Sequence, residues 1–141
     1  MKSNMFSISI GEESSRVQLF GIKAVMEIES EVERIRGQSQ DGQRVKQYMD
    51  RIDSMDQIFG LSRAFYIAVK MISEKLSNEE GFTQKDRIDH YLTLVNFTEF
   101  SQLRLIMICI QFMDYESCKY LSNNIEFKMV IEDVGLSYEL Y

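Results

Sequence analysis

Apolar and polar residues alternate with a period of two near the start of the chain. Between Phe6 and Ile10 the large apolar side chains lie on one side of an extended chain and the serines on the other, which is the pattern of a half-buried strand. A turn-rich segment at residues 11–15 leads into a second alternating stretch at residues 16–20. The two stretches predict an N-terminal β-hairpin.

From Ile22 onward the apolar residues recur at spacings of three and four, which indicates amphipathic helices. The first stripe ends in a polar loop between Gly37 and Gly42. The most regular stripe of the chain follows, at Val45, Tyr48, Ile52, Met55 and Phe59. It continues to Leu76, and we expect a kink or a break near Gly60 because the second half is apolar over more of its circumference.

Two threonines mark further helix starts. Thr83 is followed three residues later by Asp86, which resembles a capping box, and Thr98 is a second candidate N-cap for a helix that runs to about residue 121. Within that helix, residues 105–110 are apolar on every side, as in the central helix of a bundle. A buried strand is the competing interpretation of this run, but the polar residues that follow at helical spacing favour a helix.

The C-terminal region returns to a period of two. Apolar residues alternate with charged ones at Ile125, Phe127, Met129 and Ile131, interrupted only by Val130. After a turn at residues 133–135 the alternation resumes through Leu140. We therefore predict an α+β fold, in which a central four- or five-helix bundle carries the N-terminal hairpin and the C-terminal strands joined in one small antiparallel sheet. The length of 141 residues argues for a single domain, 1–141.

Acidic residues outnumber basic ones, 22 Asp and Glu against 16 Lys and Arg, which gives a formal net charge of −6. This excess of negative charge disfavours direct binding to nucleic-acid phosphates. The N-terminus lacks the apolar core of about 7–15 residues that a secretory signal needs. The longest uncharged apolar run, residues 105–113, has nine residues, against about 20 for a membrane span. We expect a cytoplasmic protein with no membrane partner.

Residues that could support catalysis or bind a metal are sparse. His90 is the only histidine and lies four residues after Asp86, whereas zinc sites use three or four protein ligands. Cys109 is expected in the core and Cys118 as a half-exposed thiol, too far along the same helix for a disulfide. Nucleophile-elbow, P-loop and dinucleotide-binding motifs are absent. We predict no catalytic residues, no cofactor and no metal site; a small enzyme that uses His90 is the third-ranked hypothesis.

Negative charge gathers toward the C-terminus. Residues 113–141 carry six acidic side chains against two lysines, a local charge of −4, together with four tyrosines. Charges concentrated in this way steer a basic partner, and tyrosine is enriched among binding hot spots. The competing interpretation is that the tyrosines pack a sheet edge and the acids keep it soluble. The residues predicted to bind a partner are Glu126, Glu132, Asp133, Tyr138 and Tyr141.

The leading functional hypothesis is a non-enzymatic acidic binding protein. It would mask a basic protein partner, such as a toxin or nuclease, in the manner of an immunity or antitoxin-like protein, which it resembles in size and acidity only. The alternative is a dimeric chaperone or adaptor for a secreted or regulatory protein, using the helical stripe at residues 45–59 or an exposed strand edge. Monomer and homodimer both stay open on the sequence.

Overall fold

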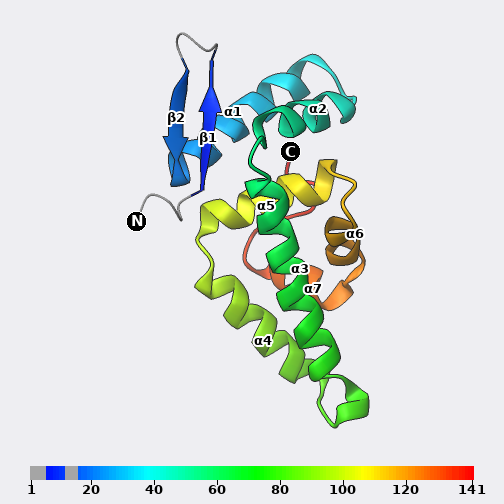
Figure 1. The fold of residues 1–141 in the computed structure, drawn as a ribbon. Coiled ribbons are helices and arrows are strands. Elements are labelled where there is room, and N and C mark those ends of the chain that lie inside the picture. The colour runs from blue at the N-terminus through cyan, green and yellow to red at the C-terminus, as the bar shows by residue number, and fades with distance from the viewer. Residues whose placement is uncertain (1–5, 12–15) are drawn as a thin grey trace.

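The computed structural model describes residues 6–11 and 16–141, and over these ranges the chain is mostly helical (Figure 1). A short hairpin precedes seven α-helices and one 3-10 helix. The elements are β1 (Ser7–Ile10), β2 (Val17–Phe20), α1 (Gly21–Gln38), α2 (Gln43–Ile52), α3 (Gln57–Lys75), η3 (Asn78–Glu80), α4 (Gln84–Phe97), α5 (Phe100–Phe112), α6 (Glu116–Asn123) and α7 (Ile125–Asp133).

The two predicted N-terminal strands and their pairing are confirmed, whereas residues 12–15 of the predicted turn lie outside the described residues. Strands β1 and β2 pair antiparallel, with Ser7 opposite Phe20 at one end. Ile8 is buried and joins the helical core, whereas the neighbouring serines face away from it. The backbone N–H of Ser7 donates to Oε1 of Gln57 at 3.0 Å, so the first residue of α3 holds the outer edge of β1.

The long apolar stripe forms two helices, α2 and α3, but the break lies at residues 53–56 and not near Gly60. The Asp53 carboxylate accepts the backbone N–H groups of Ile58 at 2.8 Å and Phe59 at 3.0 Å. These N–H groups belong to the first turn of α3, where a helix offers no internal acceptor. Gly60 stays inside α3, because one glycine costs a helix only about 1 kcal/mol and the Asp53 cap sets the start upstream.

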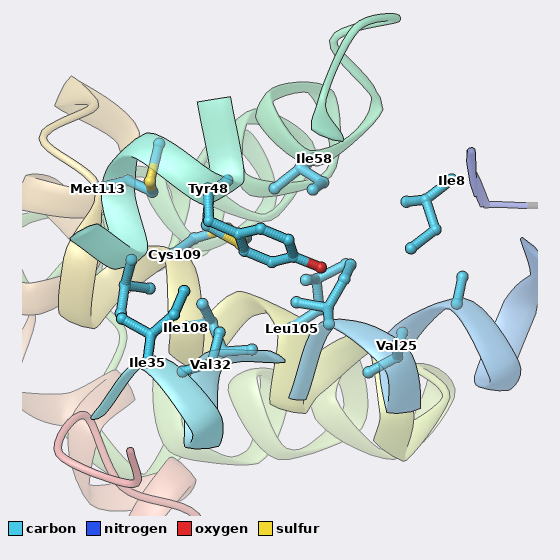
Figure 2. Packing of buried hydrophobic residues seen from close by; sticks show 14 of the residues in the cluster. Ile8, Val25, Val32, Ile35, Tyr48, Ile58, Leu105, Ile108, Cys109 and Met113 are labelled. Carbon is cyan, nitrogen blue, oxygen red and sulfur yellow. The ribbon is translucent and has the colours of Figure 1, made fainter. Parts of the chain in front are cut away.

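The first of two core clusters joins the hairpin to α1, α2, α3 and α5. Figure 2 shows its side chains converging, with the Tyr48 ring of α2 among the aliphatic side chains of α1 and α5. Its fully buried members include Val25 and Val32 from α1 and Ile108 from α5. The stripe on α1 that the sequence predicted is therefore its core face.

The second core cluster lies between α3, α4, α5, α6 and α7. Phe127 is its centre, with the Tyr91 ring at 5.8 Å and the Phe65 ring at 6.4 Å between centroids. Helix α5 passes between the clusters and contributes Leu105 to the first and Ile106 to the second. Residues 105–110 are confirmed as a central helix, and the competing interpretation as a strand is wrong. The helix ends at Phe112 and not near residue 121, because the chain leaves the helical conformation at residues 113–115 before α6 begins.

Helices α4 and α5 meet at a sharp corner. Thr98 ends α4, with its hydroxyl donating to the Leu94 carbonyl at 2.9 Å, and Glu99 takes the N-cap position of α5 instead. No single helix in the described ranges has the length and apolar character to cross a membrane. Helices α4 and α5 reach that length and character only as a pair bent by 113°, and most of α5 is buried in protein.

The predicted C-terminal strands are wrong, because residues 125–133 form helix α7. Val130, which interrupted the period-two alternation, indicates the helix. Together with Phe127 and Ile131 it forms a buried stripe, three and four residues from Phe127. Ile125 and Met129, which fitted the alternation, are exposed. The Asn124 side chain caps the helix by accepting the Phe127 N–H at 3.0 Å.

The turn at residues 133–135 is the C-cap of α7. Gly135 has a φ of +88°, and its N–H donates to the Glu132 carbonyl while the Leu136 N–H donates to that of Ile131, which is a Schellman motif. Leu136 is buried, and residues 137–141 form no strand. Within the described residues, the sheet therefore consists of β1 and β2 alone, and the predicted joint sheet does not form.

Candidate functional site

A cleft of about 760 Å³ is lined by residues from the end of α3, η3 and the start of α4 on one side and from the α6–α7 junction on the other. Most of its lining side chains carry a polar or charged group. The lining residues are Ser73, Glu74, Ser77, Asn78, Glu79, Glu80, Arg87, Tyr120, Asn123, Asn124, Ile125 and Glu126. We call this surface the acidic cleft.

The charge balance of the acidic cleft is strongly negative. Four carboxylates, on Glu74, Glu79, Glu80 and Glu126, face one guanidinium, on Arg87, which leaves a formal charge of −3 among the lining residues. Glu79 and Glu80 are adjacent on η3 and exposed. Because walls of low dielectric focus the field of like charges in a concave surface, the cleft attracts cations.

Arg87 makes four hydrogen bonds inside the protein. Its Nε and Nη2 atoms donate to the two carboxylate oxygens of Glu126 at 2.7 and 3.0 Å. Its Nη1 atom donates to the Leu76 carbonyl and to Oδ1 of Asn78. The hydrogen bonds with Glu126 raise the pKa of the Arg87 guanidinium. Four of its five N–H groups donate inside the protein, so Arg87 positions η3, α4 and α7 and has little left to offer an anionic ligand.

Asn124 joins the cleft to the second core cluster. Its Oδ1 atom caps α7, and its Nδ2 atom donates to the hydroxyl of Tyr91 at 3.3 Å. Tyr91 is completely buried, and this burial raises the pKa of its hydroxyl. The start of α7 therefore has a fixed position on the cleft wall, supported by a buried side chain below it.

The structure places one of the five predicted site residues in the acidic cleft. Glu126 lines it but is paired with Arg87. Glu132 and Asp133 are exposed at the opposite end of α7, six and seven residues further on. At 1.5 Å per residue this is about 10 Å along the helix axis. Glu126 and this acidic pair thus flank one helix without forming a single cluster.

The two predicted tyrosines have partners inside the molecule. The Tyr138 hydroxyl donates to the Leu121 carbonyl at 3.1 Å, and the Tyr141 hydroxyl donates to Oε2 of Glu29 at 2.6 Å. Burial raises the pKa of both hydroxyls. Each ring is half-buried, and Tyr141 lies against α1 and α5, away from the cleft-lining elements.

The single histidine lies on the exposed side of α4. Its Nδ1 atom is 2.8 Å from the backbone carbonyl of Asp86, while the Asp86 carboxylate completes the predicted capping box with Thr83. No group of three or more His, Cys, Asp or Glu side chains in residues 6–11 and 16–141 is arranged to hold a metal ion. The arrangement around His90 is that of a capped helix with a solvated outer face.

Both cysteines are buried, which corrects the expectation that Cys118 is half-exposed. Cys118 packs in the first core cluster with Cys109 because α6 turns back against α3 after the break at residues 113–115. Burial raises the pKa of the Cys118 thiol to about 11 and that of the Cys109 thiol well above its usual value. A buried, protonated thiol is a poor nucleophile.

Sequence reasoning missed most of the cleft. Residues 77–81 read as a loop, and their two adjacent glutamates were the only local signal of η3. Asn123 and Asn124 carried the signal of a helix N-cap, which the period-two pattern beyond them obscured. The approach of these segments, more than 40 residues apart in the chain, depends on the packing of α4 against α7.

Comparison with family models, with curated proteins and with solved structures gives no match.

Proposed function

We propose that this protein is a non-enzymatic binding module that captures a basic segment of a protein partner in the acidic cleft. In this role it masks the partner, as an inhibitor of the immunity or antitoxin type does. The observation that carries the proposal is the formal charge of −3 in a cleft whose one cationic side chain is already paired with Glu126.

The cleft chemistry favours a lysine or arginine side chain over a small anion. Carboxylates accept the hydrogen bonds of an ammonium or guanidinium group, and the cleft amides and hydroxyls provide further acceptors. An anionic or phosphorylated ligand would meet four carboxylates and would have to break the Arg87–Glu126 pair. The walls therefore select against phosphate-bearing partners and for basic ones.

The rim of the cleft suits the aliphatic part of such a side chain. Ile125 is 74% exposed at the first position of α7. Tyr120, five residues earlier on α6, also lines the cleft, and its ring lies edge-on to Tyr66 at 5.1 Å between centroids. Lysine and arginine bury their methylene stems on apolar surfaces while the charged end reaches a polar one, so an apolar rim above acidic walls matches both parts.

Glu132 and Asp133 have a separate part in the proposal. They are exposed and lie at the far end of α7, where a charge acts mainly on the approach of a partner. Exposed rim charges change the association rate and its salt dependence more than the strength of the final complex. We therefore assign steering to this acidic pair and the main contacts to the cleft.

Two matched double variants test this assignment. E79Q/E80Q removes two exposed charges from the cleft, and E132Q/D133N removes two exposed charges from the end of α7, so the net charge of both variants is the same. A fluorescent nona-lysine peptide serves as the defined probe in titrations at low and high salt. Each full-length variant also serves as bait for basic proteins in a lysate of the source cell.

If the cleft is the binding site, E79Q/E80Q weakens peptide binding by about fivefold at low salt, the size expected for two exposed ion pairs. E132Q/D133N then changes the equilibrium affinity by less than half of that and acts mainly on the association rate. Equal losses in the two variants would show that only overall charge matters, and no loss in E79Q/E80Q would contradict the cleft assignment.

A further inference from the structure

Four large apolar side chains are exposed on the first turns of α1 and on the two sides of the corner between α4 and α5. Ile22 and Met26 of α1 are 56% and 55% exposed, and Phe97 and Phe100 are 87% and 49% exposed. We call these four residues the corner patch. It shares only α4 with the acidic cleft, and Phe97 lies ten residues beyond the cleft residue Arg87 on that helix, so the binding of a basic segment leaves the patch uncovered.

The register of α1 against α5 brings the four residues to one surface. Glu29 on α1 pairs with Arg104 on α5 at 3.1 Å, and seven residues further along α1 the guanidinium of Arg36 lies over the Phe112 ring. The helices therefore run in the same direction in matched register. One turn before this ion pair, Met26 lies level with Phe100, whose ring is 5.9 Å from the Arg104 guanidinium.

The same register extends the patch by one more turn. Ile22 lies four residues before Met26 on the same side of α1, since residues i and i+4 are neighbours on a helix surface. This is the level at which α4 ends at Phe97 and the chain turns into α5. The corner patch is thus a continuous strip along the α1–α5 edge.

The exposed area is large for a protein of this size. With full residue surfaces of about 200 Å², the four exposed fractions sum to roughly 500 Å² of surface, near the upper end for the largest patch of a monomer. Two such patches facing each other would bury about 1,000 Å² before any rim is counted, which approaches the smallest specific protein interfaces.

The local charge fits a second copy of the same chain better than a basic partner. Lys23 and Glu99, both exposed beside the patch, cancel, and Glu29 and Arg104 form a closed pair. With Glu27, which follows Met26, the charges next to the corner patch sum to −1 on a protein whose net charge is −6. Two acidic copies repel each other less at a surface with little charge than elsewhere, and a twofold axis can set Lys23 of one copy against Glu99 of the other.

We propose that this protein forms a symmetric homodimer in which the corner patches of two copies pack against each other, leaving both acidic clefts open. The exposed apolar residues on α3 offer a smaller surface: Ile67 is 44% and Met71 is 56% exposed. Charged residues, including Arg63, Lys70 and Glu74, lie beside them on the same helix. The dimer carries two cation-binding clefts, which adds avidity toward a partner with repeated basic segments.

Analytical ultracentrifugation of the full-length chain between 1 and 300 μM tests the dimer, a span chosen around the dissociation constant of about 10⁻⁶ to 10⁻⁴ M expected for a small interface. Three variants receive the same charge: F97E and M26E within the corner patch, and I67E on α3 as the matched control. Circular dichroism confirms that each is folded, and because Phe97 is 87% exposed its replacement leaves no cavity in the monomer.

Between 1 and 300 μM we expect the wild type to change from monomer to dimer and to form no larger assembly. F97E and M26E should each raise the dimer dissociation constant by at least about tenfold, as for a central interface residue, while I67E leaves it unchanged. A wild-type chain that stays monomeric at 300 μM overturns the proposal. Binding to phosphatidylcholine vesicles, measured in parallel, would then show that the patch contacts lipid and not a second copy. Equal weakening by I67E, or growth into larger assemblies, also overturns it.

Discussion

Replacing Asn124 by alanine tests the junction on which both the C-terminal helix and the cleft wall depend. The side chain makes two hydrogen bonds that do different things. Its Oδ1 atom accepts the Phe127 N–H and starts α7, and its Nδ2 atom reaches down to the buried Tyr91 hydroxyl. If residues 125–133 were a strand, as their alternation suggested, neither bond would form.

The expected loss follows from these two contacts. An N-cap asparagine contributes about 1 kcal/mol relative to alanine. The 3.3 Å bond to Tyr91 is long for a neutral pair and adds about 0.5–1 kcal/mol. The Ser73 side chain also acts on the Tyr91 hydroxyl and lowers its pKa, so the hydroxyl keeps a polar neighbour when Asn124 is removed. N124A should therefore lower the free energy of unfolding by about 1.5–2 kcal/mol, or the Tm by about 6 °C for a chain of this length.

Urea denaturation followed by far-UV circular dichroism measures this loss, and two companion variants divide it. N124D keeps an oxygen that caps α7 and gains from the helix dipole, so it should lose less than half of what N124A loses. Y91F removes only the hydroxyl and should cost about 1 kcal/mol. In the double variant N124A/Y91F the two losses should fall short of additivity, because both remove the same hydrogen bond.

The reasoning is refuted if N124A unfolds within 0.5 kcal/mol of the wild type, the typical range for an ordinary surface substitution. It is also refuted if N124D loses as much as N124A, since the cap would then not be the cause. Full additivity with Y91F would show that the link between the cleft wall and Tyr91 carries no stability.

Other predictions concern groups whose ionisation the fold suppresses. Burial raises the pKa of the Cys118 thiol to about 11, so Ellman's reagent at pH 8 should label neither cysteine of the folded protein at the rate of a free thiol, and should label both in guanidinium; rapid labelling of the native protein would contradict their burial. Burial also raises the pKa of Tyr138. A group with a raised pKa favours the folded state below its unfolded pKa, about 10 for tyrosine, and this contribution is lost as pH rises above it. The urea midpoint should therefore decrease as the pH rises from 9 to 11, and it should decrease less in Y138F. The same pH dependence of the midpoint in both proteins would show that the Tyr138 hydroxyl is exposed to water.

Local patterns were decisive where one short segment holds all the information. The alternation around Ile8 predicts a strand, and a neighbouring segment completes the hairpin, so its register needs no distant contact. Thr83 and Asp86 lie within one helical turn and cap each other. The unbroken apolar run of α5 can be buried only by protein on every side, which makes it the central helix wherever its neighbours lie.

At residues 125–133 the sequence by itself was ambiguous, because the apolar positions satisfy a period of two and nearly satisfy a period of 3.6. Packing decided between helix and strand. Phe127 contacts the Tyr91 and Phe65 rings in the same core cluster that contains Val130 and Ile131. A helix places these three side chains on one side, whereas a strand would place Val130 and Ile131 on opposite sides. The start of α3 was settled in the same manner, by the Asp53 carboxylate reaching N–H groups five and six residues ahead.

Composition determines that the chain is acidic, but it does not determine where the negative charge lies on the folded surface. The sequence placed the excess charge in the last 29 residues, whereas the concave negative surface combines η3 and the end of α3 with the α6–α7 junction. The Arg87–Glu126 pair, 39 residues apart, holds these segments together. Field strength depends on the distances between charges in space and on the walls around them, and only the tertiary structure sets either one.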